Sequence, residues 1–316
     1  MSDYLWDKSG PPDPEVERLE TLLAQFRYRP GVRVLPKRRA RPALWIALGS
    51  AAALLTALGL WQAVRVRSDA WSVSVVEDAG HARTMRLRAG QTLETGVGET
   101  AHLSMARVGN LDVGPQTLLR VVSAKSNQQR FDLLRGTIHA HIGAPPRVFV
   151  VTTPSATATD LGCSYTLHVE PSGDGVLRVT SGLIEFDWKG RSAFVPTGAV
   201  ALTRAGTGPG TPFFEDASPA FRQALAAFDF EAGTESRETA LRTVLESSRA
   251  RDAVTLLNLV RSVDSQQRAA VVQRLAQLST PPAGVDLKAV MAGNFESLQA
   301  WWNALGLGHH PAVRLF

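Results

Sequence analysis

Apolar residues near the start of the chain recur with the period of an α-helix. They are spaced by three or four positions, which places them on one face of a helix. Asp13 can cap the first turn and Pro14 suits the first helical position, while Pro30 and Gly31 end the element. The apolar stripe consists of Val16, Leu19, Leu22, Leu23 and Phe26. We therefore expect an amphipathic helix within a tail that covers residues 1–42.

The next pattern is an uninterrupted apolar run, ALWIALGSAAALLTALGLWQAV, at residues 43–64. A helix of this length measures about 33 Å, which is enough to cross a hydrocarbon core of about 30 Å. Trp45 and Trp61 lie near its two ends, where indole rings favour the membrane interface. We expect a single transmembrane helix rather than a cleaved signal peptide, because 42 residues precede the run.

From residue 70 to residue 205 the period changes to short alternating stretches such as WSVSVVE, RVFVVTT and YTLHVEP. Frequent turn residues between them predict an all-β domain, either a sandwich or a short barrel. The Gly- and Pro-rich residues 206–217 are predicted to be a linker. Residues 218–316 show helical periods with short breaks, which predict an α-helical bundle or a stack of helical repeats. This helical domain would either support the β domain or provide a docking surface.

Charge gives the expected membrane segment a direction. Residues 27–41, RYRPGVRVLPKRRAR, hold seven Lys or Arg residues and no acidic residue, whereas Arg65 and Arg67 are soon followed by Asp69. The positive-inside rule places residues 1–42 in the cytoplasm and the part after the membrane segment on the opposite side of the membrane. The expected anchor residues are Arg41, Trp45, Trp61 and Arg65. The basic cluster also accounts for the net charge of +5 without direct binding of nucleic acid.

The helix of the tail needs a surface that the tail does not supply. A short isolated helix is marginal in water, so we expect its stripe to bind a cytoplasmic protein, a second copy of itself or the lipid surface. Acidic residues on its polar face make anionic lipid the poorer host, and a protein partner is favoured. Trp6 is a candidate second contact.

A resemblance to a known family emerges within the β region. The segments FDLLRGTIHAHI, RVFVVTTPSATATDLGCSYTLHV and VLRVTSGLIEFDWKGRSAFVPTGAVALT, in this order, resemble a FecR-type domain over residues 95–205. One position departs from the family pattern, because Cys163 stands where Thr is usual. The residues that carry the resemblance are Gly136, Thr153, Pro154, Leu161, Gly162, Cys163, Tyr165, Gly182 and Gly198.

This resemblance implies a regulator. FecR-type proteins sense an envelope signal and control a sigma factor, and a cytoplasmic helix followed by one membrane pass resembles the layout of transmembrane anti-sigma factors. The resemblance therefore implies a protein of the bacterial inner membrane, with its bulk in the periplasm and a cytoplasmic sigma factor as partner. The alternative is an envelope scaffold that binds a protein or a glycan without a sigma factor.

Few residues suggest catalysis or metal binding. Cys163 is the single cysteine, so it forms no intramolecular disulfide, and we expect a packed small residue rather than a nucleophile or an intermolecular disulfide. His139 and His141 share one face of a predicted strand, where they form either a solvent-facing polar stripe, which is favoured, or part of a metal site. No catalytic residue, cofactor or metal is predicted, and we expect a protein that is not an enzyme.

Overall fold

The computed structural model describes residues 13–27, 70–76, 82–125, 127–231 and 233–307. The chain divides into two compact units, Met1–Gly59 and Leu60–Phe316. The predicted membrane segment at 43–64 lies outside the described residues. Within the described ranges, no helix is both long and apolar enough to cross a membrane.

The described part of the first unit is one short helical element. Helix α2 (Pro14–Leu23) continues into a 3₁₀ turn, η1 (Ala24–Phe26). The side chain of Asp13 accepts a hydrogen bond from the backbone N–H of Glu15 at 3.0 Å, so the predicted cap is confirmed. None of the residues in α2 or η1 is buried.

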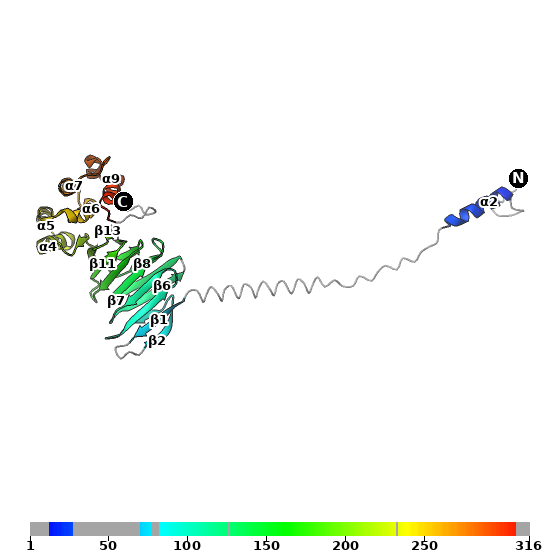
Figure 1. Cartoon of the computed structure of the whole chain (residues 1–316), viewed down its shortest axis with the longest axis horizontal. Coiled ribbons are helices and arrows are strands. Elements are labelled where there is room, and N and C mark those ends of the chain that lie inside the picture. The colour runs from blue at the N-terminus through cyan, green and yellow to red at the C-terminus, as the bar shows by residue number, and fades with distance from the viewer. Residues whose placement is uncertain (1–12, 28–69, 77–81, 126, 232, 308–316) are drawn as a thin grey trace. The chain divides into compact units, whose positions relative to one another are not determined.

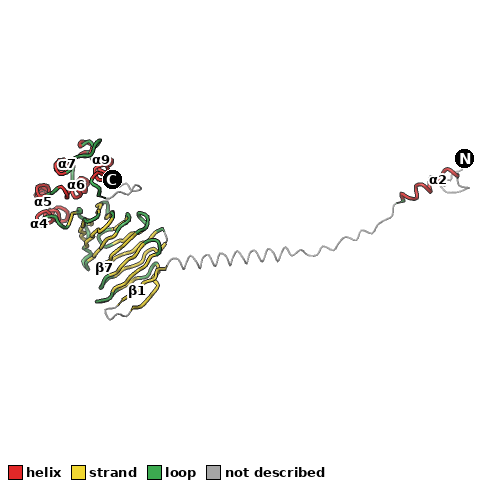
Figure 2. Tube along the Cα trace, viewed as in Figure 1, coloured by secondary structure: helices red, strands yellow, loops and turns green. Residues whose placement is uncertain are grey.

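The second unit is mostly β-sheet followed by helices, as predicted (Figures 1 and 2). The strands are β1 (Ala70–Val76), β2 (Ala82–Arg88), β3 (Thr92–Glu94), β4 (Thr100–Met105), β5 (Gly109–Val113), β6 (Leu118–Lys125), β7 (Gln128–Ile142), β8 (Phe149–Thr152), β9 (Thr157–Asp160), β10 (Ser164–Val169), β11 (Gly175–Ser181), β12 (Leu183–Trp188), β13 (Arg191–Pro196), β14 (Ala199–Arg204), β15 (Gly208–Pro209) and β16 (Phe213–Phe214).

The long strand β7 belongs to two sheets. Its first half pairs with β6 and β8, in a sheet ordered β3-β6-β7-β8-β9-β12-β13. Its second half pairs with β5 and β10, in a sheet ordered β2-β1-β4-β5-β7-β10-β11-β14. Gly136 lies where the pairing changes, at a φ of +95°. A Cβ atom there would overlap Thr117, so this corner of β7 requires glycine.

The inner faces of the two sheets form one apolar core. Strands β4 and β10 alternate strictly between inward and outward side chains, as their sequences predict. Trp71 of β1 stacks on Phe131 of β7 with ring centroids 5.0 Å apart, and Phe131 contacts Phe149 of β8 at 5.4 Å. These aromatic contacts join the two sheets across the core.

The segment predicted to be a linker is folded onto the sheet. Within 206–217, strand β15 and strand β16 both pair with β14, and residues 208–214 are buried. The Gly- and Pro-rich composition is typical of a loop, but pairing with β14 depends on contacts that a local pattern does not contain.

The helical region begins directly after these strands. Ser218 caps α4 and Pro219 opens it, as predicted. The buried helix α6 is central, and α7, α9 and β13 all contact it. The helices are α4 (Pro219–Phe230), α5 (Thr234–Ser247), η2 (Ala250–Asp252), α6 (Ala253–Ser262), α7 (Ser265–Leu278), α8 (Leu287–Met291) and α9 (Phe295–Ala304).

Helix α6 seals an open edge of the β-sheet. Strand β13 pairs with β12 on one side only, which would leave backbone groups on its other side without partners. The buried side chain of Asn258 accepts a hydrogen bond from the N–H of Phe194 at 2.9 Å and donates one to its carbonyl oxygen at 3.3 Å. Trp302 of α9 meets the Phe194 ring edge-on at 6.3 Å. At Phe194, the side chain of Asn258 thus makes the two hydrogen bonds that a neighbouring strand would make.

Two further buried polar contacts hold the helices to the sheet. The carboxylate of Asp229 in α4 accepts hydrogen bonds from the backbone N–H of Thr211 at 2.6 Å and from its hydroxyl at 3.0 Å. Thr255 in α6 donates a hydrogen bond to the carbonyl oxygen of Pro212 at 2.7 Å. The helical region is therefore an integral part of the second unit.

The Asn258 contact leads to a stability prediction. Replacing Asn258 by Leu keeps a side chain that branches at Cγ but removes both hydrogen bonds to the backbone of Phe194, which costs about 1–3 kcal/mol. We expect a lower melting temperature for full-length Asn258→Leu, measured by differential scanning calorimetry. Gln273→Leu, on the exposed side of α7, is the matched control and should melt like the wild type. Equal melting of all three proteins would refute the role of Asn258.

Candidate functional site

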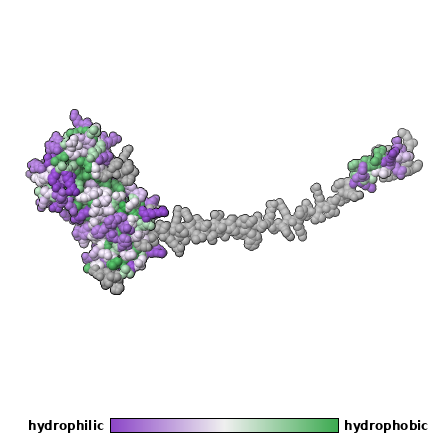
Figure 3. All heavy atoms as spheres, viewed as in Figure 1, coloured by the Kyte–Doolittle hydropathy of each residue, from purple (hydrophilic) through white to green (hydrophobic). Residues whose placement is uncertain are grey.

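The apolar stripe of α2 and η1 is exposed along its length. Leu19, Leu22, Leu23 and Phe26 are 56%, 58%, 60% and 76% exposed, and Val16 is half-buried. Figure 3 shows hydrophobic residues gathered on this helix beside hydrophilic ones. Exposure of four large apolar side chains on so short an element is typical of an interaction surface.

The polar face of this helix is acidic. Helix α2 contains Glu15, Glu17 and Glu20 but only one basic residue, Arg18. An anionic membrane surface attracts basic helices and repels acidic ones. The charge pattern therefore favours a protein over lipid as the surface that covers the stripe.

The other residues predicted for the tail and the membrane lie outside the described residues. Trp6 precedes the described part of the first unit. Arg41, Trp45, Trp61 and Arg65 fall within residues 28–69, which the structure does not describe.

Several of the residues that carry the FecR resemblance lie where two turns pass close to each other. One turn joins β9 to β10, and the other joins β11 to β12. Gly182, at a φ of +85°, lies so close to Gly162 that an added Cβ atom would overlap the Gly162 carbonyl oxygen. The carboxylate of Asp160 accepts a hydrogen bond from the Gly162 N–H at 2.6 Å. The thiol of Cys163 donates to the Leu183 carbonyl oxygen at 2.7 Å, which fastens the two turns together.

A second group of motif residues forms a turn between β8 and β9. The Thr153 hydroxyl oxygen accepts a hydrogen bond from the Ala156 N–H at 2.9 Å, and the Thr153 N–H donates to the Ala156 carbonyl oxygen at 2.7 Å. Pro154, between them, is exposed and Leu161 is buried. Gly198 donates its N–H to the Val179 carbonyl oxygen at 2.7 Å. These contacts give the motif residues a role in shaping turns.

The Cys163 environment is unsuited to nucleophilic chemistry. Cys163 is buried, as a packed small residue should be. Burial, and then the nearby Asp160, raise the pKa of its thiol, which disfavours the reactive thiolate. Tyr165 is also buried, and the pKa of its hydroxyl is raised well above its usual value by burial.

Sequence reasoning missed Asp160 as part of this cluster. Its side chain is buried, and burial raises its pKa from an ordinary value of 3.8 to about 7, against the lowering effect of the hydrogen bond from Gly162. The signal in the sequence was an acidic residue directly before the Leu-Gly pair, at the end of an alternating strand.

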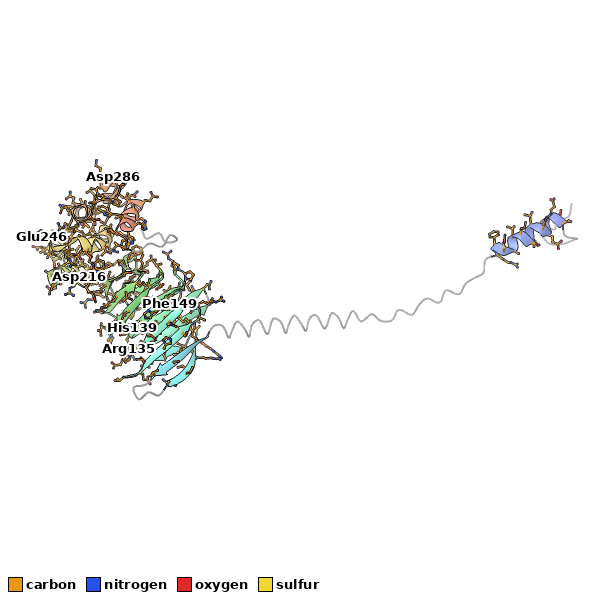
Figure 4. The ribbon with its side chains drawn as sticks, viewed as in Figure 1. Arg135, His139, Phe149, Asp216, Glu246 and Asp286 are labelled. Atoms are coloured by element: carbon orange, nitrogen blue, oxygen red, sulfur yellow. The ribbon has the colours of Figure 1, made fainter. Side chains whose placement is uncertain are left out.

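The two histidines of β7 face solvent. His139 and His141 are exposed while Ile138, Ala140 and Ile142 point inward, so the favoured polar stripe is confirmed (Figure 4 labels His139). His139 Nδ1 is 2.8 Å from the Thr166 hydroxyl, and His141 Nδ1 is 3.2 Å from the Ser164 hydroxyl. In the part of the chain that the structure describes, no group of three or more His, Cys, Asp or Glu residues is placed to hold a metal.

Comparison with known families agrees with this geometry. Residues 91–185 match the family model described as FecR protein. The chain contains a FecR domain. All of the motif positions except Gly198 lie inside the matched range, so the FecR domain includes the corner of β7 and the crossing at Gly182.

Comparison with known structures gives weaker similarity. Two crystal structures of a candidate anti-sigma factor from Parabacteroides distasonis ATCC 8503 each align with a TM-score of 0.35 and 16% identity over 43% of the present chain. The aligned region spans 65% and 64% of those chains, just under two thirds of their length. No curated protein matches the chain.

Replacement of Gly182 tests the close crossing in the FecR domain. Gly182→Ala adds an atom that overlaps a backbone oxygen, so we expect little folded protein. Gly90→Ala is the matched control, because Gly90 has a φ of +87° with nothing within 4 Å of an added Cβ, and it should cost only about 1–2 kcal/mol of backbone strain. The yield of folded protein and the melting temperature are measured for each of the two variants. Similar behaviour of the two variants would show that the crossing tolerates a side chain.

The raised pKa of Asp160 predicts a pH dependence of stability. Between about pH 4 and about pH 7 this carboxyl is protonated in the folded state and ionised in the unfolded state. The stabilisation from proton binding is therefore complete below pH 4 and lost as pH rises through about 7. Burial also raises the pKa of Asp229, to about 6. Protonation of Asp229 therefore also stabilises the folded state at low pH, and this stabilisation is lost as the pH rises through about 6.

Asp160→Asn should remove part of this pH dependence, since Asn can still accept the Gly162 hydrogen bond. We expect a smaller drop in melting temperature between pH 5 and pH 8 than in the wild type. Asp286→Asn changes an exposed helix cap and serves as control. An unchanged slope in Asp160→Asn would contradict the assignment.

Proposed function

We propose that this chain is a single-pass inner-membrane regulator whose cytoplasmic tail binds a sigma factor. The FecR domain match supports a FecR-type regulator in general. In the proposal, residues 43–64 are the membrane anchor, residues 1–42 face the cytoplasm, and the FecR domain and the helical region lie in the periplasm. The positive-inside charge pattern and the apolar run support this topology.

The exposed stripe of α2 and η1 is the observation that carries the proposal. Burying a Leu or Phe side chain contributes about 1.5–3 kcal/mol, and here four such side chains are more than half exposed. A helix this short gains stability mainly from packing of its apolar face. Binding in the groove of a partner would therefore fold and bury the helix in one step.

A protein partner fits the helix better than the alternatives do. The acidic face of α2 disfavours the anionic inner leaflet. In a parallel self-paired dimer the glutamates beside the stripe would be brought close together, which adds like-charge repulsion. A basic groove on a partner protein would bury the stripe and pair with these glutamates at the same time.

The proposed mechanism consists of binding alone. The tail would hold the sigma factor at the membrane, and a change in the periplasmic domain would alter how accessible the tail is. The hydrogen bonds of Asn258 to β13 and of Cys163 between the turns of the FecR motif suit a domain that responds as one rigid unit, because they link its elements to one another.

Charge placed in the stripe should abolish partner binding. In cells that express the full-length chain, we expect a sigma factor to copurify with the wild type. Leu19→Asp with Leu23→Asp should lower the recovered sigma factor at least about tenfold, because two desolvated carboxylates would face the groove.

Thr21→Asp with Gln25→Asp is the matched control, since it adds two carboxylates away from the stripe. This variant should bind like the wild type. The proposal fails if both double variants recover equal amounts of sigma factor, or if the wild type recovers none. Normal function after deletion of residues 2–36 would instead favour an envelope scaffold.

A further inference from the structure

A cavity lies where the helical region meets the sheet. Its volume is about 410 Å³. It is bounded by the turn and first residues of β13, by the segment between β15 and β16, and by α4, α5 and α6. Its walls are Gly190, Arg191, Ser192, Ala193, Pro209, Gly210, Thr211, Phe228, Arg237, Asn258, Arg261 and Ser262.

Three arginines from three separate elements converge on this cavity. Arg191 comes from β13, Arg237 from α5 and Arg261 from α6. No acidic residue belongs to the walls. Ser192, Ser262 and the backbone around Gly210 add polar groups between the arginines.

Nearby carboxylates offset only part of this charge. Asp229 lies 3.6 Å from the Arg191 guanidinium, and it already accepts two hydrogen bonds from Thr211. Glu185 acts electrostatically on Arg261, but it also pairs with Arg147 at 3.2 Å. Asp229 also acts electrostatically on Arg237, and Glu185 and Asp187 line an adjoining pocket that shares Arg191 and Arg261 and adds Arg130 and Arg147. Among the described residues, five arginines thus stand against three carboxylates around the two pockets, which leaves this junction positively charged.

The arginines are held in place by ring contacts as well as by charge. The Arg237 guanidinium lies 4.7 Å from the centroid of the Phe228 ring, and that of Arg261 lies 5.3 Å from the centroid of the Phe194 ring. A guanidinium at this distance from an aromatic ring is attracted to the ring face, which restricts its position in the cavity. Burial also lowers the pKa of Arg261 because its charged form loses contact with water. A bound anion beside Arg261 would stabilise that charged form.

We propose that this cavity binds a small anion with a carboxylate or phosphate group, held between Arg191, Arg237 and Arg261. The guanidinium fork matches the geometry of both oxyanions, and convergent arginines are well suited to bind them. The volume admits a ligand that is larger than the oxyanion itself, and the serine hydroxyls would contact the rest of it.

Such a ligand would strengthen the junction between the helices and the sheet. It would contact β13 on one side and α5 and α6 on the other, next to the Asn258 contact that seals the edge. Binding would therefore stabilise the folded second unit, and the stabilisation would grow with the logarithm of the anion concentration above its Kd. The inference does not depend on a sigma factor, so either proposal can fail without the other.

Thermal melting of the purified full-length chain with inorganic phosphate or citrate, at constant ionic strength, tests this site. We expect at least one of the two anions to raise the melting temperature, and isothermal titration calorimetry to give a saturable binding curve. A response to phosphate alone identifies a phosphate site, and a response to citrate alone identifies a carboxylate site.

Arg237→Gln should weaken binding at least about tenfold, the effect of losing one charge-assisted hydrogen bond. Its melting temperature without anion shows whether the variant is folded, and Arg191→Gln provides a second variant if it is not. Arg242→Gln, on the exposed side of α5 away from the cavity walls, is the matched control and should bind like the wild type. Equal loss in Arg237→Gln and Arg242→Gln, or no response to either anion, would overturn the proposal.

Discussion

The hydrogen bonds between Asn258 and the backbone of Phe194 set the architecture of the second unit. An uncovered sheet edge exposes backbone donors and acceptors that attract other strands. Here Asn258 of the central helix α6 bonds both backbone groups of Phe194 on that edge, and Asp229 of α4 likewise bonds the backbone N–H of Thr211 nearby. Helices and sheets therefore share one folded unit, and the basic cavity exists because they meet at this junction.

The tail helix presents the opposite situation. Its backbone is capped locally by Asp13, but the described part of its unit contains no core for its apolar side chains. The FecR domain, by contrast, buries its motif residues Cys163 and Tyr165 and uses its glycines for close crossings. The FecR domain therefore keeps a defined shape, and in the proposed function the tail offers the surface for a partner.

Sequence patterns predicted those features that depend on local contacts. Capping and strand periodicity act within a few residues, so both could be predicted. Examples are the Asp13–Pro14 start of α2, the Ser218–Pro219 start of α4 and the alternation around His139. The folding of 206–217 onto β14 and the convergence of Arg191, Arg237 and Arg261 could not be predicted. Both depend on segments that are distant in sequence, and composition does not report them.

Amide hydrogen exchange in residues 14–26 of the full-length chain tests the central claim most directly, namely that the stripe of α2 and η1 is buried by a sigma factor. The account predicts fast exchange in the chain alone, because a short helix without a packed face opens readily. It predicts strong protection once the copurified sigma factor is bound. A stable complex in which these amides exchange as fast as in the free chain would contradict it.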